Sequence, residues 1–279
     1  MKKVMLLMVL FFSEFVFSQT VPFQLLPSGH IVVKAIINGL EGNFILDTGA
    51  GVNVYFKTFT EKFKSNPKSY NLFTGFRATG ERLDLLLYRD QEILFAEKKF
   101  LNVPYATTDL SIPGIDGLLS LKMFENTDLL IDFLNKEITI GNITPTKYSK
   151  VIDIFISSQA DDSIDIFTYA TLNDKHKIKI LLDTGAGKNS FWINEKFIEI
   201  LAIDASALDI SEKESETNKS LKTKIYRGKI ASLSNDFSKL ENPNIVFVQN
   251  LIYEGKTSLD WLGKKLFISV SNKKIYKLD

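Results

Sequence analysis

The sequence predicts an all-β protein built from two homologous halves. Short runs rich in Ile, Val, Phe, Thr and Tyr recur along the chain, separated by turn residues and with few long helical patterns. One acidic turn occurs twice behind an apolar run, as FILDTGAG at 44–51 and ILLDTGAG at 180–187. Asp47 and Asp183 are therefore 136 residues apart (183 minus 47), about half of the 279-residue chain. This spacing indicates an internal duplication.

Four further pairs of segments support the duplication, because they repeat in the same order at offsets of 135 to 138 residues. The pairs are 35–39 with 170–174, 87–89 with 225–227, 117–121 with 255–259, and 135–138 with 272–275. A polar stretch holding Gly and Pro at 141–150 marks the boundary. We therefore expect an N-terminal lobe at 19–145 and a C-terminal lobe at 146–279.

The expected elements are mostly hairpins. Strands at 30–37 and 42–46 flank a turn, and 166–172 with 177–182 repeat that pattern. Residues 121–130 are predicted as a short helix, followed by one strand at 131–140. The charged stretch 211–224 is too polar for a core and is predicted to be an exposed hairpin tip or a mobile loop.

The first residues have the order of a secretory signal peptide. Lys2 and Lys3 precede an apolar run from Val4 to Phe12, and small or tolerated residues lead to Gln19. The alternative, an uncleaved membrane anchor, is disfavoured because the run is short for a bilayer and Glu14 interrupts it. We expect residues 1–18 to be removed and the protein to be exported, to a periplasm or to the medium.

Charge and composition limit the partners and the kinds of catalysis that are expected. Without the signal, the chain has 32 basic residues (34 less Lys2 and Lys3) and 32 acidic ones (33 less Glu14), so neither nucleic acid nor a membrane surface is an expected partner. The absence of Cys excludes thiol catalysis, and two isolated histidines offer no zinc site, so no metal or cofactor is expected. The acidic stretch 161–165 lacks the glycine and glutamate of a calcium loop and is interpreted as a solvated start to the second lobe.

The two acidic turns suggest a specific chemistry. The apolar run carries each carboxylate toward the interior, where desolvation disfavours its charge. The Thr that follows can hydrogen-bond neighbouring backbone, and the Gly permits a sharp turn. If the two turns meet, the carboxyl groups of Asp47 and Asp183 share one proton. One then acts as a base on water and the other as an acid toward a carbonyl, which is sufficient to hydrolyse an amide.

The segments 46–50 and 182–186, both Leu-Asp-Thr-Gly-Ala, resemble the active-site signature of aspartic proteases of the retropepsin and pepsin kind. The resemblance covers nearly the whole mature chain and is nearest to bacterial retropepsin-like proteins with both lobes in one chain. It implies an acid-protease fold of two β-barrel-like lobes with the active site between them. It also implies a catalytic dyad of Asp47 and Asp183, with interlocking threonines beneath it, Thr48 and Thr184. Two glycines, Gly49 and Gly185, would line the cleft, and Ala50 and Ala186 complete the residues that support the active site.

The resemblance further implies a flap that closes over the substrate, and a segment that supports each acidic turn. The flap candidate is 74–81, with Gly75 and Gly80 for bending and Phe76 to cover a peptide; the charged counterpart at 211–224 is less suited. The first support segment is 118–120. For the second, spacing favours Lys256-Thr257-Ser258, whereas composition favours Trp261-Leu262-Gly263.

These observations predict a monomeric aspartic endopeptidase that acts on peptide or protein substrates without a cofactor. The main alternative is a catalytically inactive peptide- or ligand-binding protein on the same fold. A structural or adhesive β protein is a third interpretation. A further expectation concerns pH: Ala50 and Ala186 lack a hydroxyl that could hydrogen-bond the carboxylates, so the dyad should titrate higher and work at less acidic pH.

Overall fold

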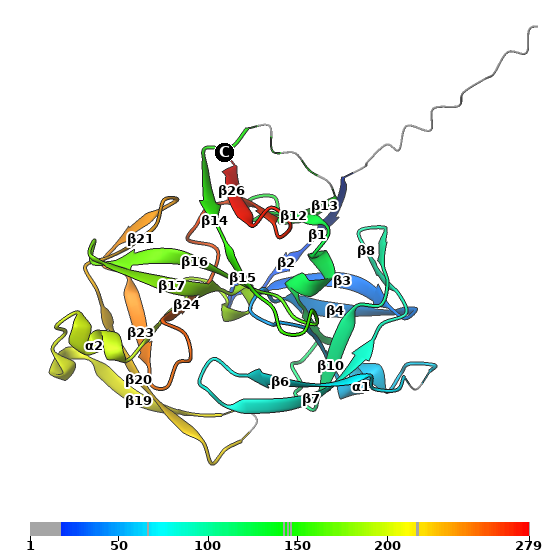
Figure 1. Ribbon diagram of the computed structural model, residues 1–279, viewed down its shortest axis with the longest axis horizontal. Coiled ribbons are helices and arrows are strands. Elements are labelled where there is room, and N and C mark those ends of the chain that lie inside the picture. The colour runs from blue at the N-terminus through cyan, green and yellow to red at the C-terminus, as the bar shows by residue number, and fades with distance from the viewer. Residues whose placement is uncertain are drawn as a thin grey trace, which may run out of the picture.

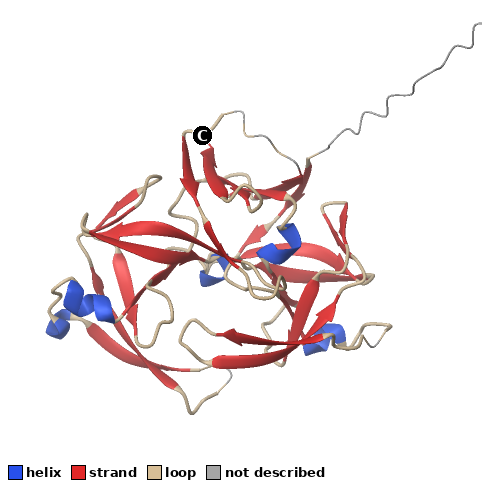
Figure 2. Ribbon diagram, in the orientation of Figure 1, coloured by secondary structure: helices blue, strands red, loops and turns tan. Residues whose placement is uncertain are grey.

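The computed structural model of the protein describes residues 18–278 except 66, 142, 144, 146, 216 and 217. Apart from Ser18, the predicted signal peptide lies outside the described residues. The described chain consists of strands with a few short helices (Figure 2). None of its helices has the length and apolar character needed to cross a bilayer. The predicted all-β class is confirmed.

The first lobe is a ten-stranded sheet with the order β6-β7-β10-β5-β11-β4-β3-β8-β9, and β2 pairs with β3 beside this path. The two edge strands, β6 and β9, do not pair with each other in the described chain. The sheet is therefore open and does not close into a barrel. Its strands are β2 (Gln24–Leu25), β3 (Ile31–Ile37), β4 (Leu40–Leu46), β5 (Asn53–Phe56), β6 (Asn71–Phe76), β7 (Arg82–Arg89), β8 (Ile93–Phe95), β9 (Lys98–Phe100), β10 (Pro104–Thr108) and β11 (Gly117–Leu119).

The second lobe repeats this topology strand for strand, in the order β19-β20-β23-β18-β24-β17-β16-β21-β22 with β15 beside β16 (Figure 1). Two lobes with one strand order are what the repeated segments predicted. The strands are β15 (Phe155–Ser157), β16 (Asp165–Leu172), β17 (His176–Leu182), β18 (Phe191–Asn194), β19 (Asp209–Glu214), β20 (Lys222–Lys229), β21 (Ser232–Ser234), β22 (Lys239–Glu241), β23 (Asn244–Val248) and β24 (Gly255–Thr257).

A third sheet joins the lobes, with the order β1-β13-β12-β25-β26-β14. Each half contributes three strands, and the halves meet where β12 pairs antiparallel with β25. The sheet lies at the top of Figure 1, opposite the hairpins β6–β7 and β19–β20. Its strands are β1 (Gln19–Pro22), β12 (Asp128–Asp132), β13 (Glu137–Gly141), β14 (Lys150–Asp153), β25 (Lys265–Ser269) and β26 (Lys274–Leu278).

The helices are short, and one expectation about them was wrong. Within 121–130 only residues 121–124 are helical, as a single 3-10 turn, and residues 128–130 already belong to β12. The expected single strand 131–140 is instead shared between β12 and β13, which form a hairpin. The side chain of Asp132 accepts hydrogen bonds from the backbone of Leu134 and Asn135, and Lys136 has a left-handed φ of 56°, so the chain reverses there. The helices are α1 (Lys57–Thr60), η1 (Leu121–Phe124), η2 (Thr184–Ala186), α2 (Lys196–Ile200) and η3 (Ala205–Ala207).

The expected hairpins β3–β4 and β16–β17 are present. The described residues of 211–224 lie in or between the paired antiparallel strands β19 and β20. In the hairpin β3–β4, Asn38 and Gly39 both have positive φ, as a two-residue hairpin turn requires. The acidic stretch 161–165 was wrongly expected to be solvated. Asp162 is 4% exposed and accepts a 2.6 Å hydrogen bond from the Tyr70 hydroxyl of the first lobe, so it helps to hold the lobes together.

Candidate active site

The strands β4 and β17 end in the two acidic turns, and each turn rests on a neighbouring parallel strand. In the first lobe, Asp47 N donates to Leu119 O of β11 at 2.8 Å. In the second, Asp183 N donates to Thr257 O of β24 at the same distance. Segment 256–258 is therefore the structural counterpart of 118–120, which settles the alignment that the sequence left open in favour of spacing.

The two threonines hold the turns against each other across the lobe interface. Thr48 Oγ1 donates to Leu182 O at 2.7 Å, and Thr184 Oγ1 donates to Leu46 O at 2.6 Å. Each hydroxyl also accepts a 3.0 Å hydrogen bond from the other threonine's backbone N–H. Both side chains are buried, at 0% and 3% exposure. This reciprocal set of four hydrogen bonds brings Asp47 and Asp183 together.

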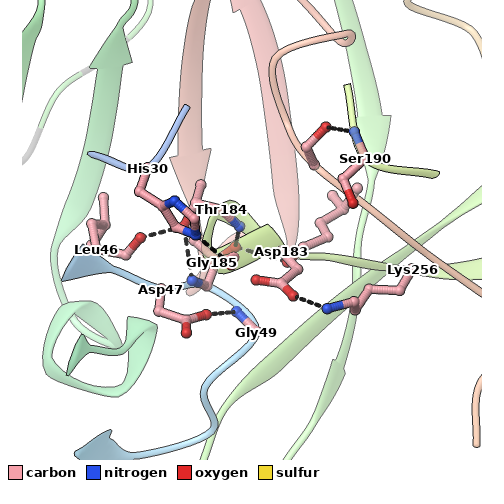
Figure 3. Close-up of polar contacts among 12 residues, drawn as sticks. His30, Leu46, Asp47, Gly49, Asp183, Thr184, Gly185, Ser190 and Lys256 are labelled. Atoms are coloured by element: carbon pink, nitrogen blue, oxygen red, sulfur yellow. Dashed lines mark hydrogen bonds and ion pairs between the residues drawn. The ribbon is translucent and has the colours of Figure 1, made fainter. Parts of the chain in front are cut away.

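The glycines of the signature let the two carboxylates approach. A Cβ placed on Gly49 would lie 2.5 Å from Cγ of Asp183, and one on Gly185 would lie 2.4 Å from Cγ of Asp47. Figure 3 shows the carboxylates facing the centre of the site from opposite turns. The backbone N–H groups of Ala50 and Ala186 close these turns by donating to the carbonyl oxygens of the two aspartates, at 3.3 Å each.

The electrostatics of the pair favour a shared proton. Burial, the charge of Asp183 and a hydrogen bond between the two carboxyl groups raise the pKa of Asp47 well above its ordinary value of 3.8. Smaller opposing effects come from Lys256 and from Gly49 N, which donates to Asp47 Oδ1 at 2.9 Å. Asp183 Oδ1 is buried and has no hydrogen-bond partner among the described residues. Asp47 is therefore the carboxyl group on which burial and neighbours favour the proton.

A lysine that the sequence did not single out as a site residue contacts the dyad. Lys256 Nζ lies 2.7 Å from Asp183 Oδ2, with only 13% of the lysine side chain exposed (Figure 3). The ammonium also lies 4.5 Å from the centre of the Trp192 ring. In β24, Lys256 pairs with Leu181, as Leu118 of β11 pairs with Ile45. The repeat alignment was thus the signal that could have revealed this contact.

The polar support segment of the second lobe is well hydrogen-bonded. Thr257 Oγ1 accepts a 3.2 Å hydrogen bond from Trp261 Nε1. Ser258 N donates to Ser190 O at 2.9 Å, and Ser190 N donates to Ser258 Oγ at 3.1 Å. Although segment 256–258 is polar where 118–120 is largely apolar, the polar groups of Thr257 and Ser258 therefore have hydrogen-bond partners. The backbone of Asp183 is held by the same 2.8 Å hydrogen bond as that of Asp47.

The dyad lies in a cleft of about 940 Å³ that both lobes line. The flap candidates Gly75, Phe76 and Gly80 line it, as expected. The hairpin β19–β20 lines it as well, through residues that include Lys213 and Lys222, so the two hairpins cover the cleft together. Most of the remaining wall is apolar, from Val54, Phe73, Leu85, Leu118, Trp192 and Ile225 among others.

The tip of the β6–β7 hairpin is docked on the second lobe. Ala78 O accepts a 3.0 Å hydrogen bond from Ile252 N, and Glu81 Oε2 accepts one of 2.5 Å from the Ser215 hydroxyl. Both contacts join segments far apart in sequence across the mouth of the cleft. The structure therefore shows the two hairpins joined to the opposite lobe beside the cleft by these two contacts.

The chain matches no protein-family model, and no curated protein shows significant sequence similarity to it.

Replacing either signature glycine by alanine should damage the site more than the fold. For Gly185→Ala we expect kcat/KM of the peptide hydrolysis proposed below to fall by about 10²-fold, because the added methyl group must push Asp47 out of place. The measurement is steady-state hydrolysis. The control is Gly39→Ala, whose Cβ would meet nothing within 4 Å but whose φ is +83°. That variant should lose about 1 kcal/mol of stability and keep its activity.

Proposed function

We propose that this protein is an aspartic endopeptidase in which Asp47 and Asp183 activate a water molecule to hydrolyse a peptide bond. The observation that carries the proposal is the reciprocal hydrogen bonding of Thr48 and Thr184. It holds the carboxyl groups of Asp47 and Asp183 together in one cleft. The resemblance of the two Leu-Asp-Thr-Gly-Ala segments to retropepsin-like and pepsin-like proteases supports the same conclusion. Among these proteases, the chain resembles most the bacterial forms that carry both lobes in one chain.

The reaction follows from one shared proton. The ionised carboxylate takes a proton from water while the water oxygen attacks the scissile carbonyl carbon. The protonated carboxyl group donates its proton to the carbonyl oxygen, which gives a neutral tetrahedral diol. Collapse of the diol returns one proton to the dyad and places another on the leaving nitrogen. The long, mostly apolar cleft suits an extended peptide with apolar side chains. We further propose that the enzyme works after export, with residues 1–18 removed, and as a monomer.

The proposal is tested by incubating the purified protein with a mixed peptide library from acidic to neutral pH and identifying products by mass spectrometry. We expect internal cleavage that disappears in both single Asp→Asn variants. Cleavage that persists in both variants would point to a contaminating protease. No cleavage at any pH, from protein shown to be folded, would refute the enzymatic proposal.

A second candidate function is peptide binding without cleavage in the same cleft. The observation that favours it is the ion pair of Lys256 with Asp183, which occupies one oxygen of a carboxylate that catalysis would use. Equilibrium binding of library peptides without product formation would favour this candidate. A structural or adhesive role has no comparable support, because it does not require two carboxyl groups within hydrogen-bond reach.

The pH profile provides a further prediction. Because burial and the charge of Asp183 raise the pKa of Asp47, this group should keep its proton above the pH at which an ordinary carboxyl group ionises. Ala50 and Ala186 add no hydroxyl that would oppose this. We expect kcat/KM to stay high into weakly acidic pH and to fall only as Asp47 loses its proton. A profile that peaks only in strong acid would contradict this expectation.

A further inference from the structure

The two lobes present different side chains to the dyad at one equivalent position. Leu118 of β11 and Lys256 of β24 both line the cleft, and each pairs with the residue two positions before the aspartate of its own lobe. In the first lobe this side chain is apolar. In the second it is an ammonium group 2.7 Å from Asp183 Oδ2. The threonines and glycines of the two turns are arranged symmetrically around the dyad. The positive charge of Lys256 is present on the second-lobe side alone.

The environment of Lys256 makes this contact strong. The lysine side chain is 13% exposed and that of Asp183 is 8% exposed, so water screens the pair weakly. The Trp192 ring lies against the ammonium and limits its movement. Within the described chain, Lys256 is the one basic side chain that forms an ion pair with either aspartate of the dyad. Asp47, by contrast, forms no ion pair with a basic side chain among the described residues, and its Oδ1 accepts the backbone N–H of Gly49.

We propose that Lys256 is a positioning residue that makes the dyad asymmetric, by holding the negative charge on Asp183 and leaving the shared proton on Asp47. This inference rests on the proposed function and assigns the two roles in it. Asp183 is then the general base, through its unpaired oxygen Oδ1, and Asp47 is the general acid. Water gives its proton to Asp183 as its oxygen bonds to the carbonyl carbon, and the carbonyl oxygen takes the proton of Asp47.

The other titratable groups around Asp183 do not supply this asymmetry. Asp165 of β16 is the nearest further acid, and burial together with the charge of Asp183 raises its pKa to about 7. Tyr253 precedes β24, and burial with the charges of Asp165 and Asp183 raises its pKa to about 12. Asp165 carries a negative charge of its own once it ionises, and Tyr253 is a neutral phenol below its raised pKa, so neither group supplies the positive charge that Lys256 does. His30 does not contact the Asp183 carboxylate, because its Nε2 donates a hydrogen bond to the carbonyl oxygen of Gly185 at 3.0 Å.

The test compares wild-type protein with Lys256→Leu, which installs the first lobe's residue, and Lys256→Arg, which keeps the charge. The first measurement is the kcat/KM profile against pH. Without the ammonium group, the dyad loses its first proton at a higher pH, which moves the acidic limb of the profile. The second proton, on Asp47, is also lost at a higher pH, which moves the basic limb. Both limbs of the Lys256→Leu profile should therefore move upward by about 1 to 3 pH units, with Lys256→Arg close to wild type. Lys34→Met, which removes a surface lysine paired with Glu41, is the charge-matched control and should not move the profile.

The second measurement needs no activity. Carboxyl ¹³C NMR titration of Asp-labelled protein, assigned with the two Asp→Asn variants, reports the charge on each aspartate without substrate. We expect Asp183 to ionise before Asp47 in the wild type, and this order to weaken or reverse in Lys256→Leu. An unchanged order in a folded Lys256→Leu protein would overturn the inference. If the wild type cleaves no peptide but shows the expected titration, the enzymatic proposal fails while the charge assignment stands. If Lys256→Leu does not fold, Lys256→Gln gives the same comparison.

Discussion

Replacing either Asp47 or Asp183 by Asn should lower kcat/KM for peptide hydrolysis by about 10⁴-fold. An amide can neither accept a proton from water nor donate one to a carbonyl oxygen under these conditions, and either substitution removes the shared proton of the dyad. The measurement is the initial rate of hydrolysis of the peptide cleaved fastest in the library. Circular dichroism and thermal unfolding should show that both variants remain folded.

The matched control is Asp165→Asn. Asp165 is another partly enclosed carboxylate beside Asp183, but it lies next to Gly51 and outside the residues that line the cleft. The variant undergoes the same chemical change and should lose less than about tenfold in kcat/KM. A comparable loss in all three variants would mean that any nearby change in charge disables the site, and the specific roles of the dyad would then be unsupported.

The two dyad variants should differ in stability even where their activities are equally low. Asp183→Asn leaves the ammonium of Lys256 in a largely buried position without its anionic partner. Asp47→Asn removes a group whose ionisation is opposed by burial and by Asp183. The free energy of unfolding should therefore fall more for Asp183→Asn than for Asp47→Asn. This difference arises from the lysine, and it is not expected from the symmetric sequence motif.

Much of this arrangement could be predicted from local patterns. The repeated acidic turns, each at the end of an apolar strand, predicted where β4 and β17 end, because burial of the strand and a Gly in the turn are both local requirements. The repeated segments likewise predicted two lobes with one strand order, since the same sequence pattern selects the same pairing in each half. The threonines were expected to interlock from the resemblance, and their hydrogen bonds do cross between the lobes.

The features that could not be predicted depend on contacts between distant segments. Lys256 was visible in the sequence as a polar residue in a support segment, but its contact with Asp183 depends on the pairing of β17 with β24. Asp162 lies in a stretch that is acidic enough to be expected in solvent. Its burial depends on Tyr70 and Arg89, which lie in the other lobe. The expected helix at 121–130 failed for the same reason, because pairing with the distant strand β25 draws residues from 128 onward into a strand.

Thr48→Val and Thr184→Val should each lower the free energy of unfolding by about 3 kcal/mol. Valine keeps the shape of threonine but loses the hydroxyl, so each substitution leaves one buried carbonyl and one buried N–H without a partner in the opposite turn. Each such group costs roughly 1–3 kcal/mol when left unpaired. Chemical denaturation of both variants measures the effect.

The control is Thr168→Val, which removes a buried hydroxyl with a single hydrogen bond of 3.1 Å to Asp153 O inside the second lobe. It should cost about 1 kcal/mol. The double variant of Thr48 and Thr184 should lose less than the sum of the two single losses, because the first substitution loosens the lobe contact and lets water reach the remaining groups. Losses that simply add would instead mean that each threonine acts alone. In that case the lobes would be held together mainly by the six-stranded sheet, and the threonines would serve only to orient the carboxylates.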